Sequence, residues 1–286
     1  MQTATSDLQH LLKLLDDDSP VVRQAVRAKL GAMRREIPEH LLALGEPLDE
    51  AQQRLLSDIL APVCREELEE TWLVWRWLAT PEAQLEEALG RLSAFLSGWQ
   101  AQASDLSRKL DRLAEKAQRE GMGDHARALA SFLFGGRGRQ ARLRGNGGDY
   151  YSAQNSNLLW VLANGVGNPI SLACIFLLVG RRLGIRIQGC NFPQHFLARV
   201  EDGGELWLVD CFNRGRFMLA QDVAKHHPAM NPAVEEVIYQ AAAVEAIIAR
   251  VLRNLDDAFV RSDNLSQRKV VRRLLLRLME AGDQEA

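Results

Sequence analysis

The sequence predicts an α+β protein in which a small antiparallel sheet lies between a helical N-terminal region and a helical tail. Apolar residues recur at spacings of three and four over the first 130 residues, which is the pattern of amphipathic helices. After Gly184 the period changes to two, as in half-buried strands, and helical spacing returns from Pro232. We therefore expect an all-helical region at 1–130, a core with the sheet at 131–225, and a helical tail at 226–286.

The composition is that of an ordinary globular protein. The 286 residues are 47% hydrophobic and 25% charged, which is too apolar for a mainly disordered chain and suggests about two domains. With 35 basic and 37 acidic residues the net charge is −2, so no global bias favours nucleic acid or an anionic membrane. The four cysteines form no Cys-x-x-Cys pair, which argues against a zinc knuckle or a thioredoxin-type site.

Neither a secretory leader nor a membrane span is expected. Residues 1–12 lack a basic stretch followed by an apolar one. Residues 150–180 carry no charge, but polar residues and a proline interrupt them, and the last apolar run at 170–180 is too short to cross a bilayer. The sequence predicts a cytoplasmic protein in which this stretch belongs to the buried core.

The helical region divides at its prolines and glycines. Ser19 and Pro20 suit the N-cap and first position of a helix. Residues 8–30 resemble a HEAT repeat, although a simple capped helical hairpin would have the same pattern. Further helices are expected at 49–60, 62–78, 81–99, 106–119 and 126–134.

A glycine-rich stretch at 135–148 separates these helices from the core. It holds the arginines Arg137, Arg139, Arg142 and Arg144. Because no aromatic residues are interleaved with them in a near-neutral protein, they are weak evidence for a nucleic-acid surface. We expect a solvated loop and do not expect nucleic acid as the partner.

The core is expected to combine two helices with four strands. A helix at 155–163 precedes a Gly-Val-Gly-Asn-Pro turn and a long apolar helix at 169–183, which Gly184 ends. Alternating apolar residues then predict strands at 185–189, 195–200, 206–210 and 217–219.

The turn between two of these strands predicts which side chains meet. Asp-Gly is a strong hairpin signal, because a type I′ turn needs positive φ at both central residues. With Asp202 and Gly203 in the turn, His195 faces Asp210 across the strands. Such an aspartate orients the imidazole ring and stabilises its charged form. A one-residue slip would separate the two, and a purely structural pair is the alternative.

Several short motifs resemble the transglutaminase-like core of the bacterial SirB family. In chain order they are Asn155-Ser156-x-Leu158, Gly167-x-Pro169-Ile170-Ser171-Leu172-Ala173, Leu183-Gly184-Ile185, Asn191-Phe192-Pro193-x-His195-Phe196 and Leu208-x-Asp210. The resemblance covers residues 132–219. The helices before it also resemble that family, and the C-terminal helices resemble its tetratricopeptide-like tail.

The resemblance implies a papain-like architecture. In the catalytic superfamily a cysteine begins a helix, a histidine opens a strand and an aspartate ends the next strand, and the helix N-terminus favours the thiolate. His195 and Asp210 match two of these positions, but the nucleophile position is Pro169, which has no thiol. The expected binding residues in the matching motifs are Asn155, Ser171 and Asn191.

Two residues are candidates for a replacement nucleophile. Ser171 is nearest to Pro169 along the helix but rotated by roughly 200° around it. Cys190 precedes His195 in a geometry that the sequence leaves open. Cys174 is expected to point into the helix core, and Cys211 to the sheet face opposite His195.

The sequence favours a non-catalytic binding or regulatory module whose partner is a protein or peptide. No cofactor or metal is expected, because the other histidines lack ligand spacing and no phosphate-binding glycine loop is present. The alternative is a hydrolase or acyl-transfer enzyme with His195 as base, Asp210 as its orienting group and Ser171 or Cys190 as nucleophile. A weaker hypothesis is a nucleic-acid-associated regulator that uses the arginines of 137–144.

Overall fold

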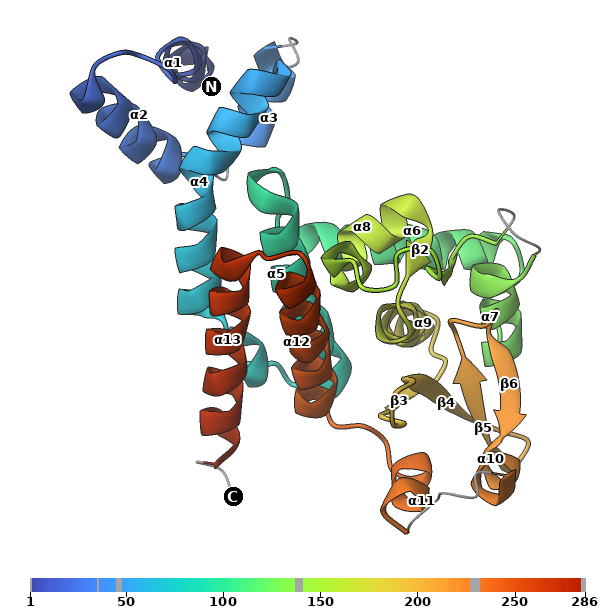
Figure 1. Ribbon diagram of the computed structural model, residues 1–286. Helices are drawn as coiled ribbons and strands as arrows, with labels where there is room; N and C mark the ends of the chain where they lie inside the picture. The colour runs from blue at the N-terminus through green and yellow to red at the C-terminus, as the bar shows by residue number, and fades with distance from the viewer. Residues whose placement is uncertain (1, 35, 45–47, 137–140, 227–231, 284–286) are drawn as a thin grey trace. The chain divides into compact units, whose positions relative to one another are not determined.

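The chain folds into helices around a small antiparallel sheet, which confirms the α+β class (Figure 1). The computed structural model describes residues 2–34, 36–44, 48–136, 141–226 and 232–283. Two compact units are formed, one from Met1–Thr71 with Ala94–Gln102 and the other from Trp72–Ser93 with Ala103–Ala286. Every site residue expected from the sequence lies in the second unit.

The first unit is helical. It contains α1 (Gln2–Lys13), α2 (Pro20–Ala32), α3 (Ile37–Leu44), α4 (Glu50–Thr71) and the short 3-10 helix η2 (Gly98–Gln100). Leucines of α1, α2 and α4 pack together with Ile37 and Trp99 to form its core. Pro20 is at the start of α2 as predicted, but the Ser19 side chain makes no capping bond; the Ser19 backbone N–H donates to Asp17 Oδ1 at 2.8 Å.

One predicted helix boundary in this unit is wrong. Two helices meeting at Pro62 were expected, whereas α4 runs through Pro62 without a break. A proline leaves the carbonyl four residues earlier without its helical partner. Pro62 and Asp58, whose carbonyl is affected, are both exposed, so water can replace the missing bond.

The second unit is organised around one buried helix. The helices that precede it are η1 (Val74–Trp77), α5 (Pro81–Ser97), α6 (Ser104–Arg119), α7 (Ala126–Phe134), η4 (Ala153–Ser156) and α8 (Leu158–Asn164). α9 (Pro169–Arg182) is buried at every position from Pro169 to Gly180. The apolar end of the uncharged stretch is therefore core, as predicted, whereas Tyr150, Tyr151, Ala163 and Asn164 of the same stretch are exposed. The expected helix at 155–163 is interrupted, because Asn157 caps α8 by accepting the N–H of Trp160 at 3.2 Å.

The sheet has the strand order β3 (Gln188–Cys190), β4 (Leu197–Asp202), β5 (Glu205–Asp210) and β6 (Arg216–Leu219). A separate parallel pair joins β1 (Arg144–Gly145) to β2 (Val166–Gly167). The first strand begins later than predicted, because the N–H of Ile185 closes the end of α9 by donating to the Gly180 carbonyl at 2.9 Å. Gly184, with φ of 73°, ends the helix as expected.

Helices cover both faces of the sheet (Figure 1). α9 packs against β4 on one face. On the other face Leu197 and Leu208 pack with Ala220 of α10 (Ala220–His226) and Ile238 of α11 (Pro232–Tyr239). The chain then forms the predicted C-terminal helices α12 (Val244–Arg261) and α13 (Leu265–Asp283), which run side by side.

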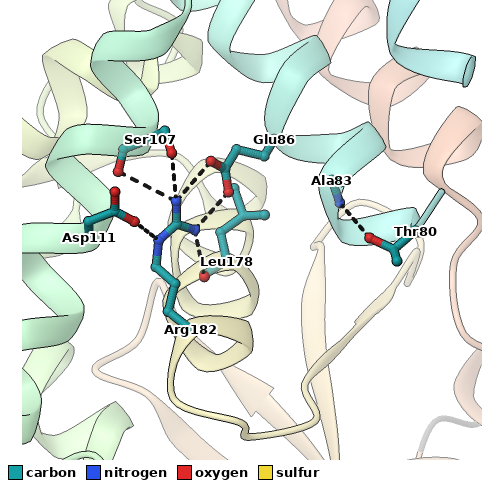
Figure 2. Close-up of polar contacts among 7 residues, drawn as sticks. All are labelled: Thr80, Ala83, Glu86, Ser107, Asp111, Leu178 and Arg182. Carbon is teal, nitrogen blue, oxygen red and sulfur yellow. Dashed lines mark hydrogen bonds and ion pairs between the residues drawn. The ribbon is translucent and has the colours of Figure 1, made fainter. Parts of the chain in front are cut away.

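A polar cluster joins three helices of this unit (Figure 2). Arg182, in the last turn of α9, donates to both carboxylate oxygens of Glu86 on α5 at 2.7 and 2.8 Å and to Asp111 on α6 at 2.6 Å. It also donates to Ser107 Oγ at 3.0 Å and to the Leu178 carbonyl at 3.1 Å. Burial lowers the pKa of Arg182, but these acidic partners outweigh it and raise that pKa above its usual value.

The glycine-rich loop is only partly described. Arg137 and Arg139 lie outside the described residues. Arg142 donates to Glu120 at 2.7 Å and to the Phe132 carbonyl at 3.1 Å, and its guanidinium lies 3.9 Å from the centre of the Phe132 ring. Arg142 is therefore a packing residue, which leaves Arg144 as the exposed arginine in the described part of this loop.

Candidate functional site

His195 and Asp210 form the hydrogen-bonded pair that the sequence predicts. His195 Nε2 lies 2.8 Å from Asp210 Oδ1. Asp210 is the last residue of β5, whereas His195 stands two residues before β4 begins. The side chains are largely shielded from solvent, with 30% of His195 and 12% of Asp210 exposed.

The strand register behind this pair differs from the predicted one. Asp202 pairs with Glu205, so Gly203 and Gly204 form the turn, with φ of 64° and 80°. Two glycines supply the positive φ values at no steric cost, while Asp202 stays in β4 and pairs with Arg127 at 3.3 Å. The register shifts His195 by two residues relative to Asp210. A shift of two keeps both side chains on one face, so the contact survives as a diagonal one.

Asp210 is held in its ionised form. The carboxylate accepts the Asn213 N–H at 3.0 Å and the Asn213 side-chain amide at 2.8 Å in addition to the His195 bond. Burial raises the pKa of Asp210, but the hydrogen bonds from His195 and Asn213 outweigh it and hold that pKa below its usual range. A fixed carboxylate at Nε2 leaves Nδ1 as the ring nitrogen available to a ligand or reacting group.

The depressed pKa of Asp210 predicts a pH dependence of stability. A carboxyl with a lowered folded-state pKa stabilises the protein above its unfolded-state pKa, and this contribution is lost as the pH falls through the folded-state value. Below about pH 4 the wild type should therefore lose unfolding free energy more steeply than Asp210→Asn. Urea denaturation at several pH values measures this, with the exposed Asp257→Asn as the matched control. Parallel pH profiles for wild type and Asp210→Asn would contradict the assignment.

Aromatic side chains continue from the pair toward the surface. The His195 ring meets Phe212 edge to face with centroids 6.0 Å apart. Phe212 meets Tyr150 at 5.9 Å, and Tyr150 meets Tyr151 at 5.2 Å. Both tyrosines are exposed. The Arg261 guanidinium lies over the Tyr151 ring, 3.7 Å from its centre, so the aromatic flank of the site is partly exposed and partly covered.

α9 begins at Pro169, as the sequence predicts, and its cap is a residue that was not assigned from the sequence. Asn168 caps the helix by accepting the Ser171 N–H at 3.0 Å, and its amide donates to Ser156 Oγ at 3.1 Å. Pro169 follows as the first helical residue and is buried. A proline at this position has neither an ionisable side chain nor a backbone N–H to offer.

A pocket of about 630 Å³ opens beside the His–Asp pair. His195 and Asp210 line it together with all four residues of β6. The remaining wall is mainly apolar and includes Val223 of α10. Its volume is in the range of pockets that bind small molecules or short peptide segments.

A family model described as the transglutaminase-like superfamily matches residues 104–253, which is more than half of the chain. The chain belongs to the transglutaminase-like superfamily. The matched region contains α9, the sheet, His195 and Asp210.

Similar proteins come from bacteria and mammals. A UPF0162 protein of Xylella fastidiosa (strain Temecula1) is 38% identical over 125 residues, which cover 42% of this chain and 44% of that protein. F-box only protein 21 of Mus musculus is 30% identical over 128 residues, 41% of this chain and 19% of that protein. The matches thus span less than half the length of these relatives. No solved structure gives a significant match.

The three expected binding residues of this transglutaminase-like chain lie in different environments. Asn155 is fully buried, and its amide donates to the carbonyls of Asp149 at 2.6 Å and Tyr150 at 2.9 Å. These two bonds fix the backbone at Asp149 and Tyr150. Ser171 is also fully buried, and its Oγ has no hydrogen-bond partner among the described residues. Asn191, four residues before His195, accepts a hydrogen bond from Arg250 through its Oδ1 at 2.7 Å. Their roles in binding stay predictions.

None of the four thiols has the environment of a catalytic cysteine. All are buried and free. Burial raises the pKa of Cys190 to about 11 and that of Cys174 to about 12, and it also raises the pKa values of Cys64 and Cys211. Cys190 Sγ donates to the Val237 carbonyl at 3.4 Å, and no described thiol or hydroxyl hydrogen-bonds the His195 ring.

Two site residues were missed by sequence reasoning. Asn213 follows Asp210 by three residues, a local spacing at which a carboxylate commonly accepts a backbone N–H, so the signal was present. Arg250 comes from α12 and donates to Asn191 Oδ1 and the Phe192 carbonyl, each at 2.7 Å. Nothing local to Arg250 indicates that it supports the segment before His195.

No group of three or more metal-ligating side chains lies together in the described part of the chain. Within the same residues, none of the helices combines the length and apolar character needed to cross a membrane.

Proposed function

We propose that this transglutaminase-like chain binds a protein or peptide in the cleft beside His195 and does not catalyse acyl transfer through a thiol. The observation that carries the proposal is Pro169 at the first position of α9, where the superfamily resemblance implies a nucleophilic cysteine. Acyl transfer on this scaffold needs a covalent intermediate, and the His–Asp pair by itself only moves protons.

The surroundings of the two candidate replacements support this proposal. Cys190 is committed to the Val237 carbonyl and its raised pKa keeps it protonated, so it is a poor nucleophile. Ser171 is fully buried without a hydrogen bond to His195, so no base is in place to activate it.

The pocket and its aromatic flank support a binding role. The pocket is largely apolar, and Phe212 connects His195 on its wall to the exposed Tyr150; apolar cavities and exposed aromatic residues are both typical of peptide-recognition sites. We further propose the SirB type within the superfamily, HEAT-like packing for residues 8–30, the three segments 1–130, 131–225 and 226–286 as functional regions, and a cytoplasmic location.

Turnover assays test the absence of catalysis. Wild-type protein is incubated with a glutamine-containing peptide, with and without a primary amine, and release of ammonia is followed. We expect no release above the level of His195→Ala. Ammonia release by the wild type that His195→Ala abolishes would overturn the proposal in favour of the hydrolase or acyl-transfer alternative.

Selection of random heptapeptides tests the binding role. Peptides are selected on the wild type and on Val223→Trp, in which a large side chain fills the pocket. We expect an enriched set on the wild type whose binding Val223→Trp weakens at least tenfold. Equal binding to both proteins would show that the pocket is not the peptide site.

A further inference from the structure

Arg216 stands out on the wall of the pocket beside the His–Asp pair. It is the first residue of β6 and pairs in register with Asp210. Its side chain is exposed and lines the pocket, yet it makes no ion pair or hydrogen bond with any described residue. An arginine directly across a strand from a carboxylate would ordinarily pair with it.

Other donors already occupy three of the roughly four acceptor positions of the Asp210 carboxylate. One carboxylate oxygen receives His195 Nε2 and the Asn213 N–H, and the other receives the Asn213 amide. The Arg216 guanidinium is not among these donors, and it lines the pocket with its fork of donors unused by any described residue. That fork matches the two oxygens of a carboxylate.

The other residues that line the pocket indicate which chemical group would carry such a carboxylate. Phe192, Leu197, Met218 and Val223 line the cavity, whose volume is about 630 Å³. This space suits one or two large apolar side chains. Asp222 is the other carboxylate on the wall, and its negative charge opposes the binding of an anionic ligand.

We propose that the pocket binds an apolar group that bears a carboxylate, with Arg216 as the carboxylate anchor. The inference rests on the proposed binding function and specifies its ligand. The C-terminus of a peptide ending in a large apolar residue has this chemistry, and so does a small organic acid.

Isothermal titration of wild-type protein with defined probes tests the inference. The probes are N-acetyl-Phe-Leu with a free carboxylate, the same dipeptide as its C-terminal amide, and hexanoate. We expect the free dipeptide to bind at least tenfold more tightly than the amide. Tighter binding of the free dipeptide than of hexanoate assigns the site to a peptide terminus, whereas the reverse order assigns it to a small acid.

Variants measure the contribution of Arg216 to binding separately from that of the rest of the pocket. In Arg216→Ala, the free dipeptide should bind only as tightly as the amide. Arg216→Lys should retain part of the affinity difference between acid and amide, and Asp222→Asn should bind the free dipeptide severalfold more tightly than the wild type. Arg186→Ala, which removes an exposed arginine outside the pocket, should bind like the wild type.

Two outcomes overturn the inference in distinguishable ways. If acid and amide bind equally and Val223→Trp abolishes both, the pocket binds peptides as proposed but Arg216 is not an anchor. If no probe binds the wild type at millimolar concentration, both the inference and the assignment of the pocket fail. Unchanged thermal unfolding of Arg216→Ala, as expected for an exposed residue, ensures that the comparison reports binding.

Discussion

Replacing Arg182 by methionine is expected to lower the free energy of unfolding by about 3 kcal/mol, the cost of breaking a buried ion-pair cluster. The guanidinium joins α9 to Glu86 on α5 and Asp111 on α6, and only 15% of its side chain is exposed. Methionine fills much of the volume but leaves Glu86, which is 16% exposed, without its cation. Urea denaturation measures the loss as a lower midpoint at an unchanged slope.

The neighbouring arginine provides the matched control. Arg181 lies in the same helical turn but is exposed, so Arg181→Met should change stability by no more than about 0.5 kcal/mol. Arg182→Lys should lose an intermediate amount, because lysine keeps the charge but not the paired bonds to Glu86. A loss for Arg182→Met as small as that of Arg181→Met would show that the cluster contributes little to the fold.

Replacing Pro169 by cysteine is expected to create a reactive thiol. The new side chain would stand at the first position of α9, where the helix N-terminus favours a thiolate. Pro169 is buried like the four native thiols, so the expected gain comes from the helix N-terminus and not from exposure, and alkylation by iodoacetamide should be on the order of 10-fold faster at the new cysteine than at any native one. Mass spectrometry of adducts over time gives both rates.

The role of His195 in that reactivity is tested by the double variant. Pro169→Cys combined with His195→Ala should lose most of the gain, because the imidazole stabilises the thiolate. Ser171→Cys serves as a positional control, because Ser171 is buried like Pro169 but points to a different side of the helix, and it should label slowly. Equal labelling of Pro169→Cys with and without His195 would mean that Pro169 does not occupy the nucleophile position.

The elements that could be predicted from the sequence are those whose ends are encoded locally. α9 begins at Asn168 and Pro169 and ends before Gly184, because a side-chain cap, a fixed φ and a positive φ each need a particular residue type. The continuity of α4 through Pro62 could not be predicted, since it depends on which side of the helix faces water.

The His195–Asp210 pair could be predicted from strand alternation, although the predicted turn position was wrong. The turn lies at Gly203 and Gly204, one residue later than expected, yet strand alternation preserves the face that His195 and Asp210 share. Arg216 and Arg250 could not be assigned from the sequence, because their positions beside Asp210 and Asn191 depend on how the strands and α12 pack.

Site-resolved labelling of the folded wild-type protein shows whether the chain has a reactive nucleophile. Iodoacetamide and a fluorophosphonate probe are applied at neutral pH, and adducts are mapped by mass spectrometry in the wild type and in His195→Ala. For a chain without a working nucleophile we expect slow thiol labelling, no serine adduct and identical patterns in the two proteins. Rapid, stoichiometric labelling of Cys190 or Ser171 that His195→Ala abolishes would contradict this expectation and identify the chain as an enzyme.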